Sequence, residues 1–313
     1  MTDRYWLISA QQGPLYAAGV LAFSFYLYAM LTYGEAFYDL KNKLQPLYDE
    51  REAVAIAHEV MYWITELDKY SRLMGKDTLF TETQQDEYEA ALEKLNRGVP
   101  LQYVTGRAWF RGREYVVNSY VLIPRPETEE LVQWIINDNR GKSGVQVLDI
   151  GTGSGCIPVS LNLELPASWV DACDISTDAL AVAEKNADNL GAGIQFEHID
   201  FLNPAERNKL GSYDVIVSNP PYIPAADRDT MHTNVKDHEP SIALFVPNED
   251  ALVFYKAIAD FGKEHLNING YIYCELDAAH AFECKALFEE EGYENVEIRK
   301  DMNDNWRMLK ARR

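Results

Sequence analysis

The residues VLDIGTGSG (147–155) run from a short apolar stretch directly into three glycines with the spacing GxGxG. A short apolar run bounded by turn residues predicts a buried strand, and glycines without a Cβ let the backbone turn tightly and lie against a ligand. The loop consists of Gly151, Thr152, Gly153, Ser154 and Gly155. A dinucleotide-binding loop has the pattern GxGxxG, but Cys156 stands where its third glycine would fall. The stretch therefore predicts a strand, a ligand-binding loop and a helix, without the dinucleotide fingerprint.

Strands and helices alternate on the C-terminal side of this loop. Apolar runs predict strands at 145–150, 169–175, 194–200, 213–219 and 271–276. Segments with apolar residues three or four positions apart predict helices between them, and the two last runs, 295–301 and 306–312, predict an antiparallel pair. This order predicts an α/β fold: a doubly wound, mainly parallel, Rossmann-like sheet with an antiparallel end pair. Ligands bind such a sheet beyond the carboxyl ends of its strands.

The sequence pattern divides the chain into four parts. An apolar extension, residues 1–29, precedes a region of amphipathic helices, residues 30–105. Residues 106–124 alternate aromatic or β-branched residues with polar ones around an Arg-Gly pair, which predicts a β-hairpin linker. Residues 125–313 form the α/β domain, and we expect the small helical domain to precede it as a separate unit.

Acidic residues follow the second and third predicted strands. Asp174 ends the second strand, 23 residues beyond Gly151, where a carboxylate can accept hydrogen bonds from two ribose hydroxyls. Asp200 and Phe201 end the third strand, where a carboxylate can accept from an adenine amine and an aromatic ring can stack on the base. Acids around a cleft repel a pyrophosphate but tolerate a sulfonium cation. We therefore predict a site for S-adenosylmethionine.

The fourth predicted strand leads into Asn219, Pro220, Pro221 and Tyr222. Two consecutive prolines fix the backbone and have no N–H to donate, so the Asn219 and Pro220 carbonyls are free to face a ligand. An amide side-chain oxygen beside a backbone carbonyl makes an acceptor pair that can hold a planar NH₂ group. An aromatic ring two residues further on can cover that plane. The tetrad predicts a site that positions a planar amine or amide for reaction.

The chain from about residue 33 to its end resembles the PrmC/HemK family, the glutamine methyltransferases of class I peptide chain release factors. The matching stretches are PLQYVTGRAWFRG (100–112), IPRPETEELV (123–132), VLDIGTGSG (147–155), Asp174, Asp200-Phe201, VSNPPYI (217–223) and HEPSIALF (238–245). The resemblance implies a helical N-terminal domain that recognises the release factor, joined by a hairpin to a methyltransferase domain.

The resemblance also implies roles for individual residues. Residues 151–155, Asp174, Asp200, Phe201 and Asn219 would hold S-adenosylmethionine, and residues 219–222 would hold the substrate glutamine. The chain departs from the family pattern after the fifth strand, where Asp277 follows instead of an early glycine, and near the last hairpin, which also lacks a glycine. These departures affect loop geometry and leave the chemistry unchanged.

The charge of the chain helps to distinguish between the functions that residues 219–222 could serve. Lys and Arg number 29 and Asp and Glu 49, a formal charge of 29 − 49 = −20, which argues against duplex DNA binding through clustered cations. A glutamine methyltransferase of a ribosomal protein is a close alternative, and an adenine methyltransferase on DNA or RNA is a more distant one. A membrane-anchored binding protein without catalysis is a third alternative, which the intact glycine loop and tetrad oppose.

Cysteine and histidine patterns bear on metals, redox state and location. Cys156, Cys173, Cys274 and Cys284 show no CxxC pair, so we expect buried, reduced thiols in a cytoplasmic protein and no disulfide framework. The histidines have no ligand spacing, so we expect no metal site.

The N-terminal segment admits two interpretations. Residues 13–31 carry no charge and are long enough to cross a bilayer, which makes them a candidate membrane segment. The alternative, which we favour, is that residues 1–29 extend ahead of a true start at Met30, because the amphipathic pattern of the helical domain begins directly after it. On this interpretation a chain that starts at Met30 folds and is active.

Overall fold

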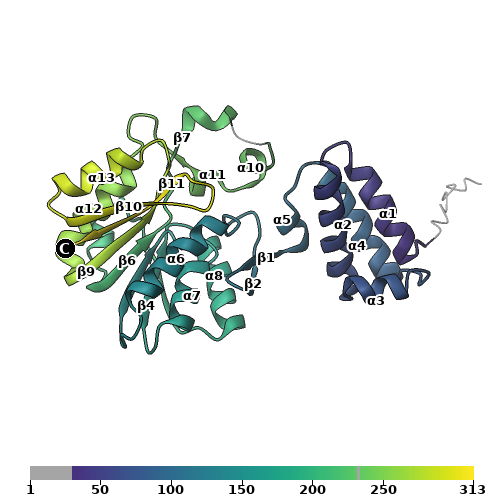
Figure 1. Cartoon of the computed structure of the whole chain (residues 1–313), viewed down its shortest axis with the longest axis horizontal. Helices are drawn as coiled ribbons and strands as arrows, with labels where there is room; N and C mark the ends of the chain where they lie inside the picture. Colours follow the sequence, from purple (N-terminus) through teal and green to yellow (C-terminus); the bar gives the residue numbers. More distant parts are fainter. Residues whose placement is uncertain (1–29, 231–232) are drawn as a thin grey trace, which may run out of the picture.

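The computed structural model describes residues 30–230 and 233–313. The helices of the N-terminal part lie apart from the sheet and its helices, and a β-hairpin lies between these two bodies (Figure 1). The predicted apolar segment 13–31 therefore falls almost entirely outside the described residues. Among the residues that are described, no helix is both long and apolar enough to span a bilayer.

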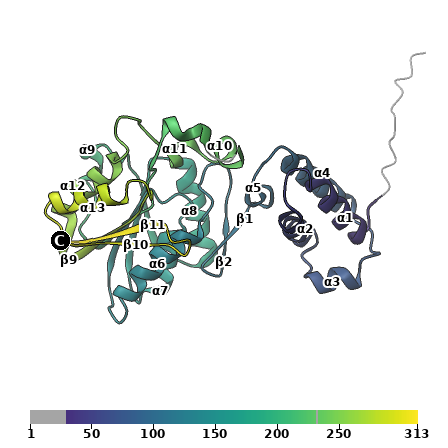
Figure 2. The ribbon, with the colours of Figure 1, turned by 45° about the horizontal axis from the view of Figure 1, so that its top comes forward.

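Five helices form the N-terminal body: α1 (Tyr33–Leu44), α2 (Glu50–Thr65), α3 (Lys69–Met74), α4 (Glu82–Asn96) and α5 (Leu101–Thr105). The apolar stripes of α1, α2 and α4 meet in one core, where Leu40, Val60 and Leu95 are fully buried. Thr32 and Thr81 cap α1 and α4 through reciprocal capping boxes, which fix where both helices begin. A second view shows the same bundle beyond the hairpin (Figure 2).

The hairpin consists of β1 (Arg107–Phe110) and β2 (Arg113–Val116), paired antiparallel as predicted. Its two turn residues, Arg111 and Gly112, have φ values of 50° and 72°, the left-handed conformation that a tight primed turn requires. The carboxylate of Glu164 accepts from Arg111 at 2.7 Å and from Arg113 at 2.8 Å. These two ion pairs fasten the hairpin to the helix that follows the glycine loop.

A seven-stranded sheet with the order β10-β11-β9-β6-β3-β4-β5 forms the second body. Strands β3 to β9 of this sheet pair in parallel, and β11 is antiparallel to both β9 and β10. The predicted fold class is thereby confirmed. The strands are β3 (Gln146–Ile150), β4 (Trp169–Asp174), β5 (Ile194–His198), β6 (Tyr213–Ser218), β9 (Leu266–Glu275), β10 (Glu294–Lys300) and β11 (Trp306–Arg312). Outside it, β7 (Ile223–Pro224) pairs with β8 (Phe245–Val246).

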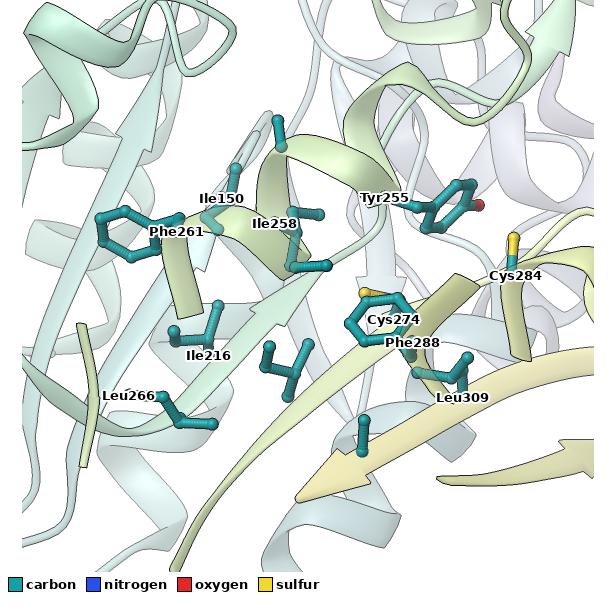
Figure 3. Packing of buried hydrophobic residues seen from close by; sticks show 14 of the residues in the cluster. Ile150, Ile216, Tyr255, Ile258, Phe261, Leu266, Cys274, Cys284, Phe288 and Leu309 are labelled. Atoms are coloured by element: carbon teal, nitrogen blue, oxygen red, sulfur yellow. The ribbon is translucent and has the colours of Figure 1, made fainter. Parts of the chain in front are cut away.

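Helices cover both faces of the sheet, so its central strands are apolar on both sides. One core contains α12 (Val253–His265) and α13 (Ala281–Glu290), and Figure 3 shows Ile216, Phe261 and Cys274 packed there. The other core contains α6 (Pro126–Asp138), α7 (Cys156–Glu164) and α8 (Thr177–Leu190). The remaining short helices are α9 (Pro204–Arg207), η1 (Ala225–Thr230), α10 (Thr233–His238) and α11 (Ser241–Leu244).

Gly155 sets how closely the glycine loop approaches α8. Its φ is +77°, and a Cβ built there would lie 3.0 Å from the Ala183 Cβ. Gly191, which ends α8, has a similar φ of +72° but no heavy atom within 4 Å of the corresponding position. Both glycines adopt a left-handed backbone conformation that other residues rarely adopt, but only Gly155 also permits a close contact, the one with Ala183.

We predict that Gly155→Ala destabilises the fold more than its matched control, Gly191→Ala. The control loses about 1–2 kcal/mol of unfolding free energy, the cost of a left-handed alanine. Gly155→Ala loses a further 1–3 kcal/mol, roughly the cost of overpacking a core contact. Urea unfolding followed by circular dichroism measures both values. Equal losses in the two variants would show that the contact with α8 is unimportant.

Candidate active site

A cavity of about 350 Å³ opens at the carboxyl ends of the parallel strands. Strands β4 and β5 lie on one side of β3 and β6 lies on the other, so the chain reverses direction across the sheet between β3 and β6. Ile150 and Ser218 are paired at the ends of these strands. Gly151 and Asn219 therefore leave the sheet side by side, and both line the cavity.

The glycine loop is held in place by β4. The N–H groups of Gly151 and Thr152 both donate to the Cys173 carbonyl, at 2.9 and 3.0 Å. The Gly153 N–H donates to Asp174 Oδ2 at 2.9 Å. Gly151 and Gly153 have φ values of +73° and +54°, so the loop needs glycine at both positions. The result is a tight turn whose backbone forms one wall of the cavity.

Asp174 has a structural task in addition to the predicted binding role. Its Oδ1 accepts from the Ser176 N–H at 2.9 Å while its Oδ2 accepts from Gly153. Burial raises the pKa of this carboxyl, and the backbone donors around it act in the opposite direction. Each carboxylate oxygen has a second lone pair. The side chain can therefore accept ligand hydroxyls while it fastens the loop.

Asp200 and Phe201 line the cavity beyond β5. Asp200 Oδ1 accepts from the Leu202 N–H at 3.0 Å. The Phe201 side chain is 5% exposed, and its ring packs edge-on against Phe261 with centroids 5.3 Å apart. The Arg207 guanidinium lies 5.7 Å from the same ring. Most of the ring surface predicted to stack on a base is thus covered by the protein.

The tetrad after β6 is divided between the cavity and the core. Asn219, Pro220 and Pro221 line the cavity together with the glycine loop and Asp174. Tyr222 packs against the core that contains α12 and α13, and it does not line the cavity. Gly155 does not line it either, and serves the approach of α8 described above.

A buried hydrogen-bond chain behind Asn219 was not anticipated from the sequence. The Asn219 Nδ2 donates to Thr128 Oγ1 at 3.2 Å, and that hydroxyl donates to Glu275 Oε2 at 2.6 Å. Thr128 lies in the first turn of α6 and Glu275 ends β9. Burial raises the pKa of Glu275 to about 7. The three residues are far apart in sequence, so no local spacing could have joined them, although Thr128 lies within the stretch 123–132 that carries the family resemblance.

Two buried polar groups, the Asp149 carboxyl and the Thr152 hydroxyl, lie next to each other at the loop. Burial raises the pKa of Asp149 to about 7, while the Thr152 hydroxyl acts to lower it. Thr152 also lines the cavity, so its hydroxyl lies where a bound ligand can reach it.

The cavity suits S-adenosylmethionine on three grounds: a glycine-lined wall, the Asp174 carboxylate and the Thr152 hydroxyl. Its lining includes many apolar side chains, in keeping with an uncharged nucleoside, and one cationic side chain, Arg125, whose guanidinium is paired with Glu239 at 2.6 Å. Within 30–230 and 233–313, no group of acidic, histidine and cysteine side chains could hold a metal ion.

Comparison with known proteins identifies relatives of both the helical region and the sheet domain. The family model of the PrmC N-terminal domain matches residues 35–106, and that of the methyltransferase small domain matches residues 128–237. A release factor glutamine methyltransferase of Bacteroides thetaiotaomicron is 40% identical over 274 residues, which are 88% of this chain and 98% of that protein. Another, from Flavobacterium psychrophilum, is 37% identical over 86% of this chain and 94% of its own length.

Among solved structures, a release factor-specific protein-(glutamine-N5) methyltransferase from Alicyclobacillus acidocaldarius matches with 29% identity. The match covers 64% of this chain and 99% of that one, with a TM-score of 0.40. The curated relatives share more than a third of their residues with this chain along almost their whole length. The chain belongs to the family of release factor glutamine methyltransferases.

Proposed function

We propose that the protein transfers a methyl group from S-adenosylmethionine to the side-chain amide nitrogen of a glutamine in a class I peptide chain release factor. The observation that carries the proposal is one shared cavity. Its wall combines the glycine loop and Asp174 with the acceptor pair of Asn219 and Pro220. The names of the relatives give the substrate, and the helical region of residues 30–105 is proposed to recognise it.

The proposed cofactor site runs along the carboxyl ends of β3, β4 and β5. Residues 151–154 would lie against the ligand, with Gly155 holding the loop close to α8 behind them and Asp174 accepting from the ribose hydroxyls. Asp200 and the edge of Phe201 would contact the base. Asn219 would close the site toward the substrate. When bound, S-adenosylmethionine supplies an electrophilic methyl group on a sulfonium sulfur.

The proposed chemistry at the substrate is one of positioning. An amide nitrogen is a poor nucleophile because its lone pair is delocalised into the carbonyl, and residues 219–222 include no strong base. Asn219 Oδ1 and the Pro220 carbonyl would each accept one N–H of the substrate amide and turn its lone pair toward the methyl group. As the N–CH₃ bond forms and the S–CH₃ bond breaks, the nitrogen would become more positive and the same acceptors would bind it more tightly, which lowers the barrier. S-adenosylhomocysteine would be the leaving group, and the methylated amide would lose one N–H proton to solvent.

Pro221 and Tyr222 have supporting roles in this proposal. Pro221 has no N–H and a fixed φ, which holds the turn rigid. Tyr222 was expected to cover the plane of the substrate amide. Its ring now packs on the core, so that role requires the ring to turn toward the cavity when substrate binds.

The proposed location is the cytoplasm. All four cysteines are buried and unpaired, and burial raises the pKa of Cys156 to about 12, so it stays a thiol. The proposed partner is a release factor, without direct binding of nucleic acid, because the net charge of −20 opposes affinity for phosphate backbones.

The substrate class is tested by offering tritiated S-adenosylmethionine with a class I release factor, ribosomal proteins and DNA in parallel. We expect label in the release factor, at a glutamine located by mass spectrometry. A release factor with that glutamine replaced by asparagine is the matched control and should stay unlabelled. Preferential labelling of a ribosomal protein or of adenine in DNA would refute the proposal in favour of that substrate.

For the cofactor, Asp174→Ala should weaken binding by about 1–3 kcal/mol, because ribose hydroxyls lose their acceptor. Isothermal titration calorimetry measures this. Since Asp174 also fastens the loop, unfolding free energy is measured alongside, and Asp174→Asn serves as a control that retains one acceptor oxygen. We expect the asparagine variant to lie between wild type and alanine. Unchanged affinity in Asp174→Ala would exclude the ribose assignment.

For catalysis, Asn219→Ala should lower kcat by roughly 10²-fold, the scale seen when one preorganised electrostatic partner is removed. Cofactor affinity should change much less, because Asp174 and the loop remain. Steady-state kinetics with the release factor, together with calorimetry, separate these effects. A near wild-type kcat would mean that the amide is activated elsewhere.

A further inference from the structure

Asn219 can serve as an acceptor only if its amide is held in one of two nearly isosteric orientations. Rotation by half a turn about its last bond exchanges the oxygen and the NH₂ group. In one orientation Oδ1 is available to a substrate N–H. In the other orientation an NH₂ group would face the substrate NH₂, where it could not accept a hydrogen bond. The active site therefore needs a device that selects the orientation.

The hydrogen-bond chain from Asn219 through Thr128 to Glu275 is such a device. An ionised carboxylate only accepts hydrogen bonds, so the single proton of the Thr128 hydroxyl is committed to Glu275 Oε2, at 2.6 Å. The Thr128 oxygen is then left as an acceptor, and it must receive an N–H. Asn219 supplies that N–H through Nδ2 at 3.2 Å. The flipped amide would place two acceptor oxygens against each other with no proton between them.

Burial raises the pKa of Glu275 to about 7, and Glu127 acts in the same direction, while the Thr128 hydroxyl and the Arg307 and Arg125 guanidinium groups act to lower it. The carboxyl is therefore mainly ionised above about pH 7, which is the condition under which the direction of the hydrogen bonds is fixed. Arg307 also donates to the Leu276 carbonyl at 2.9 Å, which keeps the cation beside the end of β9. The carboxylate has a further effect, since hydrogen bonds in a chain polarise one another. Negative charge at Glu275 makes Asn219 Oδ1 a stronger acceptor.

We infer that Thr128 and Glu275 are positioning residues that hold the Asn219 amide with its oxygen toward the substrate and strengthen that oxygen as an acceptor. This inference rests on the proposed function for the identity of the substrate. It adds two side chains, from α6 and β9, that act through Asn219 and do not themselves need to touch the substrate.

The first test compares Thr128→Val with Thr128→Ser. Valine has the same shape without the hydroxyl, so we expect kcat with the release factor to fall about 10-fold or more, the scale of a misplaced reacting group. Thr128 lines the same cavity, but the KM for S-adenosylmethionine should stay within about threefold of wild type, since most of its proposed contacts, the glycine loop, Asp174, Asp200 and Phe201, are left unchanged. Serine restores the hydroxyl and should recover most of kcat. A serine variant as impaired as valine, or a valine variant at wild-type kcat, would overturn the inference.

The second test asks whether the two residues act as one chain. Glu275→Gln can either accept from or donate to Thr128, so it removes both the charge and the fixed direction of the chain. We expect it to lower kcat, and the double variant with Thr128→Val to be no slower than Thr128→Val alone. Kinetics are run near pH 8, about one unit above the Glu275 pKa of about 7. Losses that simply multiply would mean that the residues act independently and would overturn the inference.

A third readout requires no turnover. One side-chain amide proton of Asn219, assigned by its loss in Asn219→Ala, should exchange slowly with solvent in wild type and in Thr128→Ser, and quickly in Thr128→Val. Equal exchange in all three proteins would overturn the inference. If wild type leaves the release factor unmethylated while the exchange pattern holds, the proposed substrate fails and the positioning device stands. Unfolding curves confirm that each variant is folded.

Discussion

The pairing of β3 with β6 is the constraint on which the rest of the site depends. The two strands are neighbours in the sheet although β4 and β5 lie between them in sequence. After β5, the chain crosses back to the other side of β3, where β6 pairs with it. The Ser218 hydroxyl donates to the Ile150 carbonyl at 2.7 Å and fixes the two strand ends at one level. A loop shaped by glycines and a turn shaped by prolines then begin from neighbouring points on the sheet, which is what allows cofactor and substrate to meet.

Sequence patterns were sufficient for the elements that depend on local chemistry. The strand positions followed from apolar runs, the hairpin from its Arg-Gly turn, and the location of Gly151, Asp174 and Asn219 from the rule that parallel strands present their carboxyl ends at one edge. Predictions failed to anticipate what depends on packing. Nothing local distinguishes Gly155 from the other loop glycines, yet it alone among those glycines approaches α8.

The same limit explains Phe201, Tyr222 and the Thr128–Glu275 chain. An aromatic residue at a strand end can face a ligand or the core, and its neighbours in space determine which. The Phe201 ring packs against Phe261 and Arg207. Thr128 is the third residue of α6, and nothing in the local sequence assigns its hydroxyl a partner. Its hydroxyl gained a partner because α6 begins opposite the end of β9, a contact between segments 147 residues apart.

The proposed binding role of Asp174, added to its structural one, would link the occupancy of the cavity to the order of its wall. The carboxylate that would bind a ligand also accepts hydrogen bonds from the Gly153 and Ser176 N–H groups. Opening of the loop and departure of the ligand would therefore both break hydrogen bonds to Asp174. By mass action, a ligand that binds only the closed loop suppresses opening in proportion to its concentration relative to its dissociation constant. On the proposed role of Asp174, saturating cofactor would therefore also protect the loop at Gly153 from proteases.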